Sequence, residues 1–410
     1  MKNSTYTSLR YIGIALLALM LAGLAGWYLF LRERTADVEA GAAARGFGSG
    51  IPAFTGALGS TLTNLLSGFA IEPADSTREG AQAPRLWRVN PTPVAGMGFS
   101  ATSSTVYFME RSTGYIFEAN PETSRIERLT NTLIPKVYTA RFSPQGAVAA
   151  HAENDRKAVM AFSGTFERAT TTGEFAPLRT TPLGANVHAA IPTEDELLIT
   201  LVADESGSVL SRAALEAAAA ERLFSSFMRR WSVHALPDSR IFLAEPAASG
   251  VPGNAYELRD GALRPVARGV AGLTILPHPT QDALLIGSDS GTALTLSVRL
   301  SPEATLLSLP VRTLPEKCVW ARESLVAYCA VPRVVPAPNF IDAWYRGAAH
   351  TSDAWWRIDA SAGTAELLYS PEAELGFGVD VEHPVIDTTG SYIAFVNSRD
   401  KSAWLFRVAE

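Results

Sequence analysis

The sequence predicts an all-β fold, a seven-bladed β-propeller, with a single transmembrane helix at its N-terminus. Three features of the 410-residue chain lead to this prediction. An uncharged apolar run occupies residues 11–31, a stretch rich in Ala, Gly, Ser, Thr and Pro follows it, and seven similar strand–turn–strand units fill the remainder. We therefore expect a cytoplasmic stub and anchor over residues 1–34, a flexible linker over 35–84 and a propeller over 85–410.

The first element is the apolar run at residues 11–31, which carries no charge for 21 residues. This length lets a helix cross a hydrocarbon core of about 30 Å. Cleavable signal peptides have a shorter apolar region, of roughly 7–15 residues, so the run predicts an uncleaved anchor; a buried core helix is the alternative. Lys2 and Arg10 precede the run, and Arg32 and Arg34 follow it, so the flanking charges nearly balance. The α-amino group adds to the short side, and we predict the N-terminus inside and the propeller outside.

A second uncharged stretch lies within the linker, at residues 47–71. Its 25 residues include five glycines and many hydroxyl groups, which make a poor membrane span. We expect a linker or a surface-lying amphipathic segment here, and a second membrane span is the remaining alternative.

From residue 85 onward, short runs of β-branched and aromatic residues alternate with turn residues, which is typical of strands. One unit recurs seven times: an apolar strand, a turn of Pro, Ser, Asp or Gly, and a second apolar strand. The equivalent apolar residues of the units are Phe99, Phe142, Ile191, Leu236, Leu276, Trp320 and Ile386. They are 40 to 49 residues apart, except for a last step of 66. Steps of about 40–50 residues are the period of four-stranded blades, so seven units predict seven blades.

The two ends of the repeat region predict how the ring closes. The first unit has an outer strand of its own at residues 124–130, whereas the last unit has none after the strand at 403–410. A strand-like run at 85–90 has no hairpin partner nearby, so we expect it to complete the seventh blade and remove an open strand edge. Residues 214–223 have high helix propensity, and we expect a short helical turn there that leads into a strand at 220–226.

The longest insertion of the repeat lies in the sixth unit, at residues 331–356, and accounts for the step of 66 residues. Long insertions in compact domains are often binding loops, and Trp, Tyr and Arg are common in interaction hot spots. Two alternatives remain open: the aromatic residues pack against the propeller, or they bind a partner or ligand. The residues of this candidate binding loop are Arg333, Phe340, Asp342, Trp344, Tyr345, Arg346, His350 and Trp355.

Several motifs of the repeat region resemble a known kind of propeller. The segment RFSPQGAVAAHA contains a signature turn, EKCVWARESLVAYCAVP spans residues 316–332, and a WxID-like strand occupies 356–359. With these motifs the chain resembles the WD-repeat-like or TolB-like β-propellers of bacterial envelopes, and among them a group of membrane-anchored propellers from small-genome bacteria. The resemblance covers the anchor and residues 85–410. It implies the fold and a place in the envelope, but that group has no assigned activity to transfer.

The only two cysteines of the chain, Cys318 and Cys329, are expected to face each other across a hairpin in the sixth unit. A two-residue turn at Glu323 and Ser324 places them opposite each other on a hydrogen-bonded pair, with Cα atoms about 5.5 Å apart. We therefore predict a disulfide, which persists in an oxidising compartment. The alternative is two small buried side chains in a cytoplasmic blade.

Composition and spacing also limit the classes of function. The chain has 35 Lys and Arg against 41 Asp and Glu, and this acidic balance argues against a nucleic-acid partner. The six histidines lack the spacing of a zinc site, and neither a GxSxG turn nor a phosphate-binding loop is present. His188 and His234 stand at matching positions of two units, which indicates a repeated structural role. We expect no catalytic residue, no metal and no cofactor.

Together these features predict an extracytoplasmic propeller, anchored in the cell membrane by residues 11–31, that acts as a protein-interaction scaffold in the cell envelope. The first alternative is a cell-wall or carbohydrate-binding surface protein that uses the aromatic residues of the insertion. The second alternative is a hydrolase or an oxidoreductase on the propeller scaffold, because a fold does not decide a function.

Overall fold

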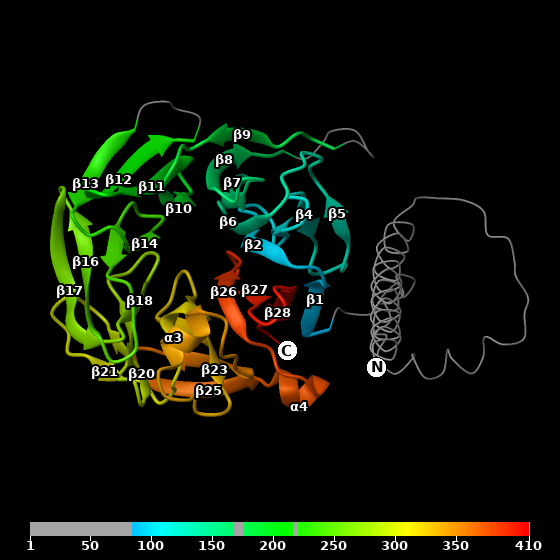
Figure 1. The fold of residues 1–410 in the computed structure, drawn as a ribbon. Helices are drawn as coiled ribbons and strands as arrows, with labels where there is room; N and C mark the ends of the chain where they lie inside the picture. The colour runs from blue at the N-terminus through cyan, green and yellow to red at the C-terminus, as the bar shows by residue number, and fades with distance from the viewer. Residues whose placement is uncertain (1–83, 168–174, 216–219, 410) are drawn as a thin grey trace, which may run out of the picture. The chain divides into compact units, whose positions relative to one another are not determined.

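A computed structural model describes residues 84–167, 175–215 and 220–409 of the chain. These residues form seven four-stranded antiparallel sheets, arranged as blades around a central axis (Figure 1). The predicted all-β, seven-bladed propeller is therefore confirmed. The predicted anchor at 11–31 and the uncharged stretch at 47–71 lie outside the described residues. Within the described part of the chain, no helix is long and apolar enough to cross a membrane.

Each of the first six blades is a meander whose strands run in chain order from the axis outward (Figure 1). The strands of blades 1 to 3 are β2 (Val94–Phe99), β3 (Val106–Glu110), β4 (Ile116–Ala119), β5 (Ile126–Arg128), β6 (Val137–Phe142), β7 (Ala147–Glu153), β8 (Val159–Thr165), β9 (Arg179–Pro182), β10 (Val187–Pro192), β11 (Leu197–Asp204), β12 (Gly207–Ala214) and β13 (Glu221–Ser226). Those of blades 4 to 6 are β14 (Ser232–Ala235), β15 (Ile241–Ala244), β16 (Pro252–Arg259), β17 (Ala262–Ala271), β18 (Thr274–Pro277), β19 (Leu284–Asp289), β20 (Leu294–Arg299), β21 (Leu307–Ser308), β22 (Cys318–Trp320), β23 (Val326–Pro332), β24 (Asp353–Asp359) and β25 (Thr364–Tyr369).

The seventh blade joins the two ends of the described chain. Its strands, from the axis outward, are β26 (Val381–Ile386), β27 (Tyr392–Asn397), β28 (Ala403–Arg407) and β1 (Leu86–Asn90). Leu86 lies opposite Phe406 and Trp87 opposite Leu405, so the strand expected at 85–90 closes the last blade. Three short helices complete the described elements: η1 (Pro315–Lys317), α3 (Phe340–Tyr345) and α4 (Pro371–Leu375).

The hydrophobic core lies between neighbouring blades. One cluster joins Phe108 of blade 1 to Val396 and Leu405 of blade 7, all nearly inaccessible to water. Burying such a side chain contributes about 1.5–3 kcal/mol, so each junction of two blades stabilises the ring. The junction of blades 1 and 2 is close enough to require a glycine: a Cβ on Gly98 would lie 2.6 Å from the Cβ of Phe142.

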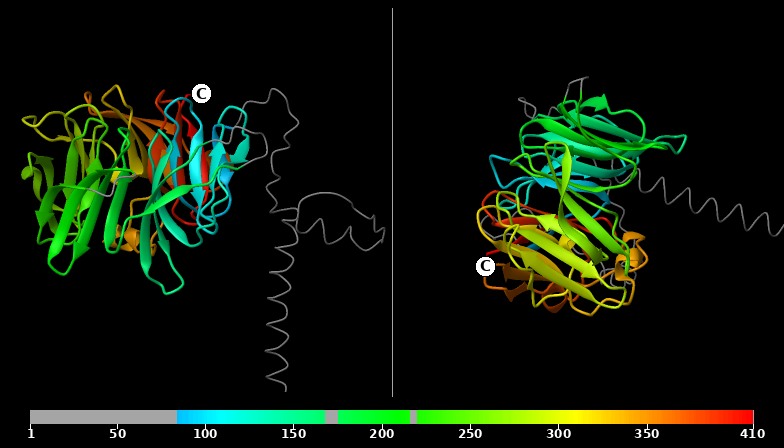
Figure 2. Two further views of the ribbon diagram at one scale, coloured as in Figure 1. Left: turned by 90° about the horizontal axis from the view of Figure 1, so that it is seen from above. Right: turned by 90° about the vertical axis from the view of Figure 1, so that its left-hand side faces the viewer.

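The meander gives the ring two faces, because successive strands run in opposite directions (Figure 2). The turn face carries the loops between the first and second and between the third and fourth strands of each blade, including residues 143–146 and 321–325. The insertion face carries the loops between the second and third strands and the loops between blades, including residues 227–231 and 333–352. α3 and α4 both lie in loops of the insertion face.

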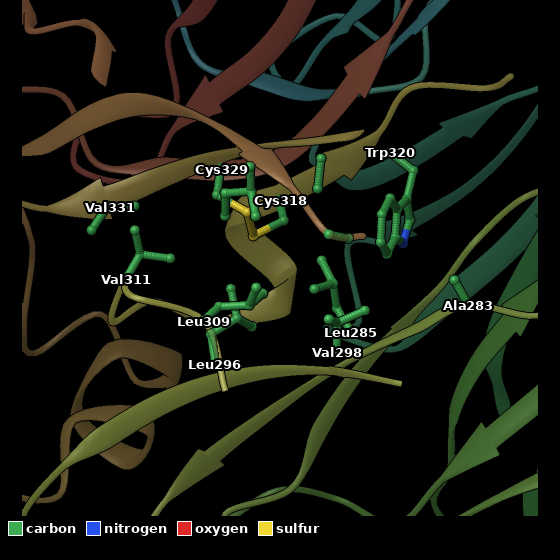
Figure 3. Close-up of a cluster of buried hydrophobic side chains, with 13 residues drawn as sticks. Ala283, Leu285, Leu296, Val298, Leu309, Val311, Cys318, Trp320, Cys329 and Val331 are labelled. Carbon is green, nitrogen blue, oxygen red and sulfur yellow. A yellow bond between two sulfur atoms is a disulfide. The ribbon is translucent and has the colours of Figure 1, made fainter. Parts of the chain in front are cut away.

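Cys318 and Cys329 form the predicted disulfide, inside a buried apolar cluster at the junction of blades 5 and 6 (Figure 3). The prediction that the two cysteines form a hydrogen-bonded pair was wrong. The hairpin turn has four residues rather than two, and the Ala321 N–H donates to the Val326 carbonyl at 2.9 Å. Since pair types alternate along an antiparallel ladder, the cysteines fall on a non-hydrogen-bonded pair, with Cα atoms 4.0 Å apart.

Two further expectations concern blades 3 and 4. The strand expected at 220–226 is present as β13, although its sequence favours a helix; residues 216–219 of the expected helical turn lie outside the described residues. The matching of His188 with His234 is wrong. His188 lies at a bulge of β10, between the pairs made by Val187 and Ala189, whereas His234 lies in a regular pair with Phe242. The bulge adds one residue to β10, and only an alignment of the units that leaves it out makes the two histidines equivalent.

Candidate functional site

The candidate binding loop lies on the insertion face, between β23 and β24, and its helix α3 lies toward the axis of the ring (Figure 1). Its two ends are joined by a hydrogen bond from the Arg333 N–H to the Ser352 carbonyl, at 2.9 Å. Within it, Asn339 has a positive φ of 56°, a conformation that Asn tolerates better than most residues, and the helix α3 starts at the next residue. The insertion is therefore an ordered structure with a helix at its centre.

The apolar side of α3 is buried against blade 5. Phe340, Ile341 and Trp344 pack on Leu294 and Leu314, and all five side chains are buried. Phe340 and Trp344 therefore pack against the propeller, which was the first of the two alternatives. These two rings are covered by their own propeller in this structure.

Trp355 lies deeper still and belongs to the core. It has no exposed surface, and its ring stacks on Phe406 of blade 7 with centroids 5.3 Å apart. It is part of β24, the third strand of blade 6, and packs between blades 6 and 7. As the start of a strand rather than part of a loop, Trp355 serves the packing of the ring.

Asp342 and a buried carboxylate of blade 5 fix α3 to two other blades. The Ser249 N–H, from blade 4, donates to Asp342 Oδ1 at 3.2 Å. Asp289 of blade 5 accepts hydrogen bonds from the Ser249 hydroxyl at 2.6 Å and from the Ile341 N–H at 3.2 Å. The insertion of blade 6 is thus bonded across blades 4 and 5.

A buried ammonium group joins the insertion to blade 7. Lys317, the last residue of η1, has no exposed surface, and its Nζ donates to Asp353 Oδ2 at 2.7 Å and to Asp380 Oδ1 at 2.5 Å. It also donates to the Thr351 hydroxyl at 2.9 Å and lies 4.8 Å from the centre of the Trp344 ring. Two carboxylates pair this charge, so the group is fully engaged in holding the structure together.

Asp380 is the centre of this network. Besides Lys317 it accepts hydrogen bonds from Trp344 Nε1 at 3.1 Å, from His350 Nδ1 at 3.0 Å and from the Thr351 hydroxyl at 2.9 Å. Burial alone would raise the pKa of Asp380, but the charge of Lys317 and these hydrogen bonds lower it below its usual value. Asp380 therefore stays ionised and holds the C-terminal end of α3, and the residues that follow it, on the ring.

Glu316 and Tyr345 form a second polar contact, also at the C-terminal end of α3. The Tyr345 hydroxyl donates to Glu316 Oε1 at 2.5 Å, and burial raises the pKa of the Glu316 carboxyl, an effect that this hydrogen bond partly offsets. Burial also raises the pKa of Tyr345, so its hydroxyl keeps its proton. The Tyr345 side chain remains 50% exposed, and it is the one aromatic residue of the candidate loop that faces solvent among the described residues.

The remaining predicted residues lie at the surface of the insertion. Arg333 makes an ion pair with Glu372 of α4 at 2.9 Å, with both side chains partly exposed. Arg346 is exposed, and the His350 side chain is 28% exposed. Within the described ranges, no group of three or more His, Cys, Asp and Glu residues could hold a metal ion. The arrangement offers a surface for binding, with its carboxylates and its lysine already engaged.

The exposed apolar side chains of the loops and short helices are unevenly distributed between the two faces. On the turn face, the described residues of this kind are Phe175 and Leu306. Those on the insertion face are Leu133, Phe227, Val251, Val334, Val335, Tyr345, Leu375 and Phe377. Phe227, in the loop between blades 3 and 4, is 96% exposed. The insertion face is therefore the more apolar of the two.

Sequence reasoning missed Lys317, Asp380 and the role of Asp289, because they come from three segments that only the fold brings together. Lys317 lies in the segment 316–332 that carries the resemblance, but a lysine that follows a glutamate carries no signal of its own burial, and Asp289 and Asp380 stand in none of the motifs named above. The motif-like aromatic residues of the insertion were found, but their burial depends on Leu294 and Leu314, which belong to another blade.

No protein-family model matches the sequence, and no curated protein matches it. Solved structures resemble the fold. An oligogalacturonate lyase in complex with manganese is 12% identical, with a TM-score of 0.52 over 81% of this chain and 95% of that one. The tricorn protease is 10% identical, with a TM-score of 0.51 over 80% of this chain and 34% of that one. A putative TolB from Agrobacterium tumefaciens is 11% identical, with a TM-score of only 0.38 over 53% of this chain and 80% of that one. At these identities, the likeness shows the propeller fold alone.

Proposed function

We propose that this protein is a membrane-anchored, extracytoplasmic β-propeller that binds a protein partner in the cell envelope through its insertion face. The observation that carries the proposal is the uneven distribution of exposed apolar side chains in the loops and short helices that the structure describes, eight on the insertion face against two on the turn face. Exposed apolar groups that gather on one side of a soluble domain mark interaction sites. The partner binds to that side.

The segment from Phe227 to Arg230 gives the chemistry of the partner surface. Phe227 is almost completely exposed, and Arg229 and Arg230 are exposed beside it and make no ion pair with any described residue. Aromatic residues and arginines are enriched in the hot spots of interfaces. They fit a partner with an apolar pocket flanked by carboxylates, because charge complementarity increases both specificity and the association rate.

The compartment is part of the same proposal. The disulfide between Cys318 and Cys329 supports an oxidising environment, because such bonds are rare in the cytosol. The uncharged run at residues 11–31 predicts an anchor that keeps the propeller at the membrane. Both features agree with a propeller on the outer side of the cell membrane.

The alternatives have less support. The carbohydrate-binding hypothesis depended on exposed aromatic rings, and three of the four rings named in the insertion, Phe340, Trp344 and Trp355, are buried. Two of the structural neighbours are enzymes by name, at identities that extend to the fold alone. The absence of a catalytic activity stays a prediction.

Site-specific photo-crosslinking in intact cells tests the partner. A photoreactive phenylalanine analogue replaces Phe227 or Tyr345 on the insertion face, and Phe175 or Leu306 on the turn face as matched controls. We expect the two insertion-face positions to give the same protein adduct and the turn-face positions to give none. In the Arg229→Glu/Arg230→Glu background, the adduct from position 227 is expected to disappear. Equal adducts from both faces, or none from either, would contradict the proposal.

Thiol labelling tests the compartment separately. Cells are quenched with acid, denatured and treated with a polyethylene-glycol maleimide before or after reduction, so that the buried cysteines become accessible. We expect Cys318 and Cys329 to shift on a gel only after reduction. Labelling without reduction would show free thiols and reverse the proposed topology, whatever the crosslinking result.

A further inference from the structure

A cavity of about 300 Å³ lies on the axis of the ring, at the turn face. All seven blades line it, and each contributes a residue of the loop between its first and second strands, from Ser100 of blade 1 to Asp387 of blade 7. The ends of several innermost strands, among them Val319 of β22 and Val385 of β26, form the deeper wall. Figure 1 shows the innermost strands arranged around the axis. Ligand sites are concave spaces of roughly 300–1,000 Å³, so this cavity has the size of a site for a small molecule.

The wall of the cavity is mostly apolar. Of the 19 described residues that line it, eight have apolar side chains and five are prolines. Four of the apolar residues, each from a different hydrophobic cluster, are only partly buried: Phe142, Leu276, Val319 and Val385. They pack on the core and also border the cavity, so they leave apolar surface for a ligand to cover. An apolar cavity of about 150 Å³ holds a benzene molecule, so this one has room for two fused rings.

The charged residues of the described lining are Glu194, Arg322 and Asp387, and the fold already pairs all three. Arg322 Nη1 and Nη2 each donate to one carboxylate oxygen of Glu194, both at 2.8 Å. The Asp387 carboxylate accepts hydrogen bonds from the Ser104 hydroxyl at 2.8 Å and from the Tyr392 N–H at 2.9 Å. A charged ligand would have to break one of these contacts or stay without a counter-charge, which is costly. The lining therefore favours an uncharged ligand.

The ion pair of Arg322 and Glu194 also marks the solvent side of the cavity. Glu194 belongs to blade 3 and Arg322 to blade 6, and these blades lie across the axis from each other (Figure 1). Both residues stand in loops of the turn face, where the Arg322 side chain is 34% exposed and that of Glu194 25%. The pair thus crosses the axis among the loops, and a ligand between it and the innermost strands is partly screened from water.

We propose that this axial cavity binds a small uncharged organic molecule with an aromatic body of one or two rings. Phe142 offers a partly buried ring in the wall, and contacts between aromatic rings add to the effect of burial. Prolines lack an N–H, and Trp320 Nε1 already donates to the Leu276 carbonyl at 3.1 Å, so these residues supply no donor to an anionic group. The site lies on the face opposite the insertion and is independent of the proposed protein partner.

Photolabelling of the purified full-length protein in detergent tests the site, with 1-azidonaphthalene as the uncharged two-ring probe and peptide mapping by mass spectrometry as the readout. We expect saturable adducts on the peptides that line the cavity, and suppression of these adducts by excess 2-naphthol. 2-Naphthoate has the same rings and a carboxylate, and it is expected to compete at least about 10-fold less well, because its charge finds no free partner. Val385→Phe fills part of the cavity and is expected to reduce the labelling by about 10-fold or more. Val159→Phe makes the same change at an exposed position of β8 and, as the control, is expected to be labelled like the wild type.

A second variant separates loss of the site from loss of the fold. Thr388→Phe narrows the same cavity from an exposed loop position, outside the core, and is also expected to reduce the labelling. Unchanged labelling in both Val385→Phe and Thr388→Phe would overturn the site, as would adducts that do not saturate or that lie only outside the lining peptides. Competition by 2-naphthoate equal to that by 2-naphthol would overturn the assignment of an uncharged ligand.

Discussion

The disulfide of blade 6 gives a prediction whose magnitude follows from the sequence separation. Cys318 and Cys329 are 11 residues apart and both are buried. Closing a loop of this size restricts the unfolded chain and is worth about 3 kcal/mol. Unfolding of a domain of about 300 residues gains roughly 0.6 kcal/mol/K in entropy at its midpoint, so reduction is expected to lower the Tm by about 5 °C.

Thermal unfolding of the full-length protein in detergent, followed by circular dichroism with and without a phosphine reductant, measures this shift. Cys318→Ala/Cys329→Ala is the control. It cannot form the bridge, so the reductant is expected to leave its Tm unchanged, and its Tm is expected to lie at or below that of the reduced wild type. The additional loss reflects the two small cavities left in the cluster of Figure 3.

Two results would contradict this reasoning in different ways. Two free thiols in the unreduced protein would show that the bridge does not form. A bridge that forms, together with an unchanged Tm on reduction, would show that the hairpin is as restricted in the unfolded chain as in the folded one. The entropy argument would then fail, although the structure would stand.

The other predictions concern ionisable groups of the ring. Lys317→Met leaves the carboxylates of Asp353 and Asp380 buried without their cation, so urea unfolding is expected to show a loss of about 3–5 kcal/mol; a loss below about 1 kcal/mol would contradict this role. Burial lowers the pKa of His234 from 6.5 to about 4. Over this range the unfolded chain binds a proton that the folded chain does not, so stability is expected to fall as the pH decreases, by up to about 1.4 kcal/mol per pH unit. His234→Gln is expected to remove that slope in urea unfolding at several pH values, and equal slopes would contradict the assignment. Glu194→Gln breaks the partly exposed ion pair between Glu194 of blade 3 and Arg322 of blade 6, for a loss of at most about 1 kcal/mol, and a double-mutant cycle of the two residues that shows no coupling would contradict the contact.

The fold could be predicted because its signals are local and repeated. Each blade needs an apolar innermost strand, a tight turn and a second apolar strand, and this pattern recurs with a nearly constant step. The closure by residues 85–90 followed from the same count, since one blade lacked an outer strand and one strand lacked a blade. The hairpin turn before Val326 was harder, because turns of two and four residues give the same pairs of residues and differ only in which pairs are hydrogen-bonded.

The site could be predicted only in part. The insertion of blade 6 stands out by its length and its aromatic residues, but interface hot spots and protein cores use the same residues. Whether Trp344 faces a partner or a core depends on Leu294, which is 50 residues away in the sequence and belongs to another blade. Phe340 and Trp344 are buried and Tyr345 is exposed, because they lie on different sides of α3.

Lys317 shows how the fold offsets the cost of burying a charge. Lys317 has no exposed surface and donates to two carboxylates, a hydroxyl and a carbonyl, so its cost of burial is offset within the fold. The loss of either partner alone leaves an uncompensated buried charge, so the lysine and its two carboxylates are expected to be needed together.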